Sequence, residues 1–186
     1  MRKLYVGILA SACIGTIADA HDNDGLDSSI CIRSHEVSLH VNTKSVTQLD
    51  QVGTVVITSK DFFPPGIPGV QCKLVGHIDP TLSNFAKGEL VINHHISECV
   101  ANSQSLQGTF ATLHDTGKVR YQVGTISYAD EQIRHIDPHS PPTGIFDGSI
   151  KPLHLKIAMS IDATTGQNVG GGYGLLLRKE RCLANE

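Results

Sequence analysis

The chain has 186 residues, a formal net charge of −3 at pH 7, 18% charged residues and no tryptophan. This length suits a single domain with a hydrophobic core of its own. With no basic run to neutralise phosphates, the composition argues against nucleic acid as a partner.

The first twenty residues have the order of a secretory signal peptide. Residues 2–3 are basic, residues 4–18 are almost continuously apolar or small, and residues 18–20 read Ala-Asp-Ala, a small-x-small cleavage sequence. The apolar part is shorter than the roughly 20 residues of a transmembrane helix, and no later segment approaches that length. We therefore expect cleavage near Ala20, a secreted or periplasmic location, no transmembrane segment, and one β domain over residues 21–186.

The cysteines after the signal peptide are expected to form two disulfides. They are Cys31, Cys72, Cys99 and Cys182. An even number of cysteines outside the cytosol is typical of disulfide-bonded proteins. Three pairings are open, and strand order favours Cys72 with Cys99 and Cys31 with Cys182. Structural zinc is the weaker alternative, because the chain lacks a Cys-x-x-Cys pair.

Apolar and polar residues alternate with a period of two along much of the chain, as in strands with one buried face. The alternation predicts strands, in chain order, at residues 31–41, 52–58, 70–78, 88–97, 109–113, 119–128, 153–161 and 169–178. Two hairpins are expected, turning at residues 114–118 and 162–167. Helical signals are limited to a turn or two within residues 81–87 and 101–107.

About eight strands joined mostly by short turns predict an all-β fold. The favoured architecture is a single antiparallel β-barrel, with a β-sandwich as the alternative. A bond between Cys31 and Cys182 favours the barrel, because it places the first and last strands side by side. The glycine-rich run at residues 170–174 is expected to allow a bend, a bulge or close backbone packing, since no helix follows to make it a phosphate loop.

Two long connections, residues 59–69 and 129–152, depart from the short-turn pattern. They carry the large apolar residues Phe62, Phe63, Ile67, Ile145 and Phe146. Long loops in compact domains are often functional, and exposed apolar patches mark binding surfaces. We therefore predict that these residues bind a protein partner or a small apolar ligand. The structural alternative is that they cap one end of the barrel.

Histidine is the most prominent reactive residue, with ten in the chain. His94 shares a strand face with apolar neighbours and is a candidate general acid or base inside the barrel. His135, Asp137 and His139 are close in sequence and are candidate catalytic residues and candidate ligands of a divalent metal. The alternative is a structural role, because neither spacing matches a strong metal motif.

Three functions follow from these features. The first is an exported binding protein that uses its long loops. The second is a small β-barrel enzyme, such as an isomerase, a cyclase or a metal-assisted hydrolase, with histidines at one barrel end. The third is a fimbrial or surface structural subunit that accepts a donated strand.

Overall fold

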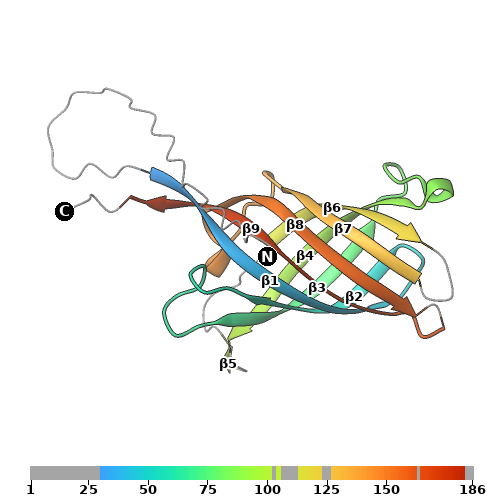
Figure 1. Ribbon diagram of the computed structural model, residues 1–186, viewed down its shortest axis with the longest axis horizontal. Helices are drawn as coiled ribbons and strands as arrows, with labels where there is room; N and C mark the ends of the chain where they lie inside the picture. The colour runs from blue at the N-terminus through green and yellow to red at the C-terminus, as the bar shows by residue number, and fades with distance from the viewer. Residues whose placement is uncertain (1–29, 102–103, 106–112, 123–126, 163, 183–186) are drawn as a thin grey trace, which may run out of the picture.

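The computed structural model describes residues 30–101, 104–105, 113–122, 127–162 and 164–182, so the predicted signal peptide lies outside the described residues. These residues form a closed antiparallel barrel of eight strands (Figure 1). The strands are β1 (Ile30–Ser45), β2 (Asp50–Thr58), β3 (Gly69–Ile78), β4 (Glu89–Ala101), β6 (Leu113–Gln122), β7 (Ser127–Ile136), β8 (Ser149–Asp162) and β9 (Gln167–Arg181). A two-residue strand, β5 (Gln104–Ser105), is added to β4.

The strand order is β3-β2-β1-β9-β8-β7-β6-β4, and hydrogen bonds between β3 and β4 close the barrel. This closure confirms the predicted barrel over the alternative of a sandwich. The alternation of apolar and polar residues decides which side chains face the barrel interior. In β8, Leu155, Ile157 and Met159 are buried, while the residues between them are exposed. The buried side chains of the strands pack together as one core inside the barrel.

A short 3-10 helix, η1 (Phe85–Lys87), lies in the connection between β3 and β4. The Asn84 side chain accepts a hydrogen bond from the Lys87 N–H, and the helix ends at Gly88 in the left-handed region, with φ of 63°. The helical turn expected within residues 81–87 is therefore present. A second 3-10 helix, η2 (Gly144–Phe146), lies between β7 and β8.

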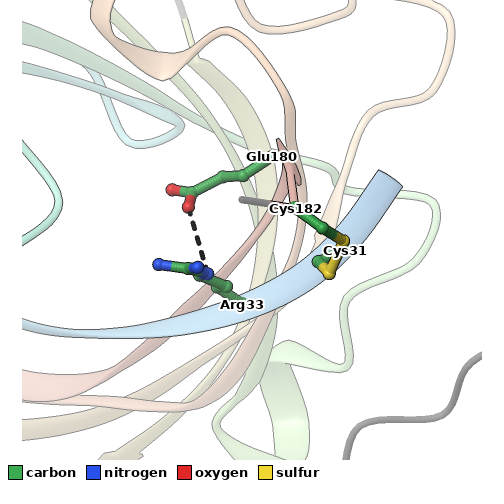
Figure 2. The surroundings of a disulfide bond; sticks show 4 residues. All are labelled: Cys31, Arg33, Glu180 and Cys182. Carbon is green, nitrogen blue, oxygen red and sulfur yellow. Dashed lines mark ion pairs between the residues drawn. A yellow bond between two sulfur atoms is a disulfide. The ribbon is translucent and has the colours of Figure 1, made fainter. Parts of the chain in front are cut away.

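Both disulfides have the favoured pairing. Cys31 of β1 is bonded to Cys182, the residue after β9, and Cys72 of β3 is bonded to Cys99 of β4. Figure 2 shows the first bond near an ion pair between Arg33 and Glu180, whose Nε and Oε2 atoms are 3.5 Å apart. The disulfides indicate an oxidising environment outside the cytosol. Among the helices of the described residues, none has the length and apolar character needed to cross a membrane.

The glycine-rich run lies in β9, where its backbone packs closely against β8. A Cβ atom at Gly172 would overlap the Lys156 carbonyl oxygen, and a Cβ at Gly174 would lie 2.5 Å from the Leu155 Cα. The register between β8 and β9 shifts in the same region, between Leu153 and Lys156. Glycine here serves close backbone packing, one of the roles expected from its position in a strand.

The turn predicted at residues 114–118 is wrong. These residues lie within β6, which pairs with β7 rather than folding back on itself. Gly117 follows a register shift in this pairing, and a Cβ at Gly117 would overlap the Glu131 carboxyl. The turn-like composition thus reflects a bulge that makes room for a side chain. Because residues 127–136 form a strand, the second long connection shrinks to residues 137–148.

Candidate functional site

The two ends of the barrel are built differently (Figure 1). The connections at residues 59–68 and 137–148 lie at the end where β1 begins and β9 finishes, which we call the capped end. The connections at residues 46–49, 79–88 and 164–166 lie at the other end, which we call the open end. In Figure 1 the open end is on the right, with η1 at the upper right.

Large apolar side chains close the capped end. Phe62 and Phe146 are 2% and 0% exposed, and their ring centroids are 6.0 Å apart. Phe63 is also buried, and Ile67 and Ile145 are half-buried against the core. All five side chains predicted to bind a partner therefore pack inward. The geometry favours the capping alternative for them, and their role in binding stays a prediction.

Arg178 of β9 ties the two capping loops together. Its Nη1 donates to the Phe62 carbonyl at 3.2 Å, and its Nε donates to the Asp147 carbonyl at 2.8 Å. The guanidinium carbon also lies 5.3 Å from the centroid of the Phe62 ring, a cation–π geometry. One side chain thus links both loops to the barrel wall.

His35 is a buried contact of the capped end that the sequence did not reveal. Its Nε2 is 2.9 Å from Glu180 Oε1, and its Nδ1 is 3.3 Å from Asp61 Oδ2. Its ring also meets the edge of Phe62 at a centroid distance of 5.5 Å. These contacts connect β1 and β9 to the first capping loop, which is a structural role.

The open end contains a cavity of about 630 Å³, which we call the mouth cavity. The side formed by β3, β4, β6 and β8 is apolar and is lined by Ile78, Leu90, Ile92, Val119, Met159 and Ile161. The side formed by β1, β2 and β9 is polar and is lined by Ser45, Asp50, Gln51 and Asn168. Because β2, β1 and β9 are neighbours in the barrel, these polar groups form one continuous arc.

The polar arc contains a partly buried hydrogen-bond network. The Thr43 hydroxyl donates to Gln51 Oε1 at 3.0 Å. The Asn168 Nδ2 lies 3.4–3.5 Å from oxygen atoms of Thr43, Ser45 and Gln51. Asn168 is only 5% exposed, and its Oδ1 has no hydrogen-bond partner within the described part of the chain. A buried acceptor without a partner costs about 1–3 kcal/mol.

The acidic residue in the polar arc is engaged by its own neighbours. Asp50 Oδ1 is 2.6 Å from His77 Nδ1, and Asp50 Oδ2 accepts a hydrogen bond from the Thr47 hydroxyl at 2.7 Å. The hydrogen bond from His77, followed by that from Thr47, lowers the pKa of Asp50 below its ordinary value. Asp50 is therefore ionised at neutral pH.

His94 and Glu131 form a buried pair deeper in the barrel. His94 Nε2 is 3.5 Å from Glu131 Oε1, and the side chains are 5% and 2% exposed. Both line a small inner cavity of about 20 Å³, room for about one water molecule. Gln51 and Met159 line this inner cavity and the mouth cavity as well. His94 thus faces the interior, as its alternation indicates, and its catalytic role stays a prediction.

The other predicted catalytic and metal-binding residues lie at the capped end. His135 and His139 are exposed, and Asp137 accepts a hydrogen bond from the His139 backbone N–H at 2.8 Å. No group of three histidine, cysteine, aspartate or glutamate side chains in the described residues could hold a metal ion. The divalent metal site predicted at His135, Asp137 and His139 gains no support from this geometry and stays a prediction.

Sequence reasoning missed the residues that matter most at the open end. Asp130 and Gln132, on either side of Glu131, are exposed. A strand predicted at these residues would therefore have placed the Glu131 carboxyl on the inner face of the barrel. Gln51 and Asn168 gave no comparable signal, because polar residues near a strand's start resemble ordinary turn residues.

Comparison with protein-family models, curated proteins and solved structures finds no match for this chain.

Proposed function

We propose that this protein is an exported binding protein that holds a small, largely apolar molecule in the mouth cavity. The observation that carries the proposal is a cavity of about 630 Å³ with one apolar side. Ligand sites in proteins are typically clefts of roughly 300–1,000 Å³, mostly apolar with a few polar groups. The signal-peptide sequence and the two disulfides support export.

The open end suits entry of an apolar molecule. Phe85 of η1 lines the mouth cavity and is 54% exposed, so the apolar wall continues to the rim. At about 25 cal/mol per Å², a ligand that buries roughly 200 Å² of apolar surface gains about 5 kcal/mol before the costs of association. At the capped end, by contrast, Phe62 and Phe146 are buried in the barrel interior.

The proposal is tested by titrating the protein with N-phenyl-1-naphthylamine, a neutral dye that fluoresces in apolar sites. We expect saturable binding that weakens at least tenfold in Leu90→Trp and in Ile161→Trp, because either indole would project into the cavity and obstruct its apolar side. Tyr173→Trp is the matched control, since Tyr173 is 72% exposed and does not line the cavity. Absence of saturable binding, or equal binding by folded cavity variants, would refute the proposal.

A second candidate function is acid–base catalysis on the bound molecule. It is favoured by the His94–Glu131 pair, because the inner cavity that this pair lines shares Gln51 and Met159 with the mouth cavity. A carboxylate and an imidazole so placed could remove a proton from a ligand carbon and return one. The test is deuterium incorporation into a bound ligand in D₂O, followed by NMR. Exchange should disappear in Glu131→Gln, and a ligand that never exchanges rules out this candidate.

The structural-subunit alternative gains no support from the described residues. A subunit that accepts a donated strand needs an open sheet edge. Here β3 pairs with β4, and this pairing closes the barrel. We therefore do not propose it.

A further inference from the structure

Exposed apolar side chains gather at the open end, on the connections that border the mouth cavity. Leu82 and Phe85, between β3 and β4, are 66% and 54% exposed, and Val46, between β1 and β2, is 57% exposed. The two connections are adjacent, because the Leu49 carbonyl accepts a hydrogen bond from the Ile78 N–H at 2.7 Å. We call the three exposed side chains the apolar rim. Apolar surface of this kind typically contacts another molecule.

The connection between β3 and β4, which projects from the barrel at the upper right of Figure 1, bonds most of its own backbone groups. The Asp79 carboxylate accepts hydrogen bonds from the N–H groups of Thr81 and Leu82, at 2.8 and 3.2 Å. The N–H groups of residues 83–84 and 87–89 donate to backbone oxygens of the same segment. Backbone groups bonded in this way leave water at little cost, which contact with lipid requires.

The charges around the apolar rim suit the headgroup layer of a phospholipid surface. Lys87, two residues after Phe85, is exposed. A lysine beside apolar residues places its stem along apolar surface and its ammonium among polar headgroups. The nearby carboxylates of Asp50 and Asp79 accept hydrogen bonds from neighbouring side chains, and Glu89 lines a separate groove on the outer wall. Because these carboxylates outnumber Lys87, the complementary lipid is zwitterionic rather than anionic.

From the apolar rim, its bonded backbone and its lysine, and resting on the proposed function, we infer that the open end docks on the surface of a zwitterionic phospholipid membrane. Leu82 and Phe85 enter the boundary between headgroups and acyl chains, and Lys87 lies among the phosphates. Phe85 also lines the mouth cavity, so docking places the cavity entrance against the lipid. An apolar ligand then passes between membrane and cavity without crossing water.

The first test uses tryptophan fluorescence, because the chain has no tryptophan of its own. With phosphatidylcholine vesicles, we expect the emission of Phe85→Trp to shift by about 10 nm to the blue and to be quenched by brominated acyl chains, as for an indole at the lipid interface. Ile32→Trp is the matched control, since Ile32 is 61% exposed on β1 near the capped end. Its emission should not change. No response from Phe85→Trp, or equal responses from both variants, overturns the inference.

Vesicle flotation measures docking independently of tryptophan. Leu82→Ser should lower the partition coefficient onto phosphatidylcholine vesicles by about fivefold, because an exposed leucine no longer enters the lipid, whereas Ile32→Ser should leave it unchanged. Binding that requires phosphatidylglycerol and is insensitive to Leu82→Ser would show simple electrostatic attraction and overturn the inference.

The outcomes separate this inference from the proposed function. Leu82 does not line the mouth cavity, so Leu82→Ser should bind N-phenyl-1-naphthylamine normally when vesicles are absent. If the dye binds but the protein does not float with vesicles, membrane docking is wrong, the apolar rim fits a protein partner instead, and the binding function stands. If the dye does not bind, the proposed function fails, and flotation still decides whether the open end docks on lipid.

Discussion

Inside the barrel, His94 and Glu131 are energetically dependent on each other. Each is buried, and their nearest polar atoms are 3.5 Å apart. Removing one residue breaks this contact inside the barrel, and breaking a buried pair costs about 3–5 kcal/mol. We therefore expect His94→Leu and Glu131→Leu each to lower the free energy of unfolding by about this amount. The double variant should lose much less than the sum, as measured by urea unfolding of all four proteins. Strict additivity would show that the two residues do not form a coupled pair.

Half of this pair could be predicted from sequence. His94 lies on the same strand face as the buried residues Ile92 and Ile96, so its inward orientation follows from the period of two. Glu131 was not predicted, because residues 129–136 were assigned to a loop. Its burial depends on Gly117 of the neighbouring strand, where a side chain would overlap its carboxyl. Such complementarity between strands depends on register, which a single strand's pattern does not contain.

At the scale of single strands, β9 depends on glycine at alternate positions. A Cβ at Gly172 would overlap the Lys156 carbonyl oxygen and lie 2.8 Å from the Ile157 Cα, and backbone atoms cannot move aside cheaply. A Cβ at Gly171 would lie 3.2 Å from the Leu39 carbonyl oxygen, a milder contact. We expect Gly172→Ala to cost about 2–3 kcal/mol of stability by overpacking, and Gly171→Ala less than about 1 kcal/mol. Denaturant unfolding of both variants measures the difference. Equal costs would mean that β8 and β9 are not so closely packed.

Aspartates stabilise three of the open-end connections. The pKa values of Asp50, Asp79 and Asp162 are lowered below the ordinary value of 3.8. The main causes are hydrogen bonds from His77 to Asp50, from the Thr81 side chain to Asp79 and from the Thr165 side chain to Asp162. A lowered pKa in the folded state stabilises the protein above pH 3.8, and this stabilisation is lost as pH falls through the folded-state pKa.

The unmodified protein should therefore lose more thermal stability between pH 5 and pH 2 than the triple variant Asp50→Asn, Asp79→Asn, Asp162→Asn. Melting temperatures measured across this range should converge at the acidic end. Parallel curves would show that these carboxylates contribute nothing through their ionisation.

The strands were easier to predict than their connections. Residues 153–161 and 169–178 alternate regularly, and both segments lie within observed strands. Residues 114–118 read as a turn because Asp-Thr-Gly is typical of turns, yet here the glycine follows a bulge in β6. Local composition gives the same signal for a turn and for a bulge. The pairing of β6 with β7 decides between them.

For the whole molecule, closure of the barrel could be predicted, but the mouth cavity could not. A period of two indicates which side chains face inward, and the cysteines indicate that the chain ends meet. A cavity arises where inward side chains stop short of filling the space, which depends on how eight strands tilt around it. The sequence predicts binding by the large apolar residues of the long loops, but these residues pack inward and close the capped end. The binding site that we propose is at the opposite end.

The two disulfides should contribute unequally to the stability of this barrel. The Cys31–Cys182 bond joins residues 151 positions apart, whereas the Cys72–Cys99 bond joins residues 27 positions apart. In the chain-entropy model the longer loop contributes about 5 kcal/mol and the shorter loop about 3.5 kcal/mol, because the unfolded chain loses more freedom when a longer loop is closed. Cys31 and Cys182 are also half-buried, while Cys72 and Cys99 are 1% and 3% exposed.

A mild reductant should therefore open the Cys31–Cys182 bond first in the folded protein. Alkylation and peptide mass mapping should identify a species modified only at Cys31 and Cys182, with a lowered melting temperature. The variant Cys31→Ser, Cys182→Ser should match this species in stability. Modification at Cys72 and Cys99 first would contradict the prediction and would mean that β3 and β4 separate before the chain ends do. The predicted order instead makes the pairing of β1 with β9 the part of the barrel that depends most on an oxidising environment.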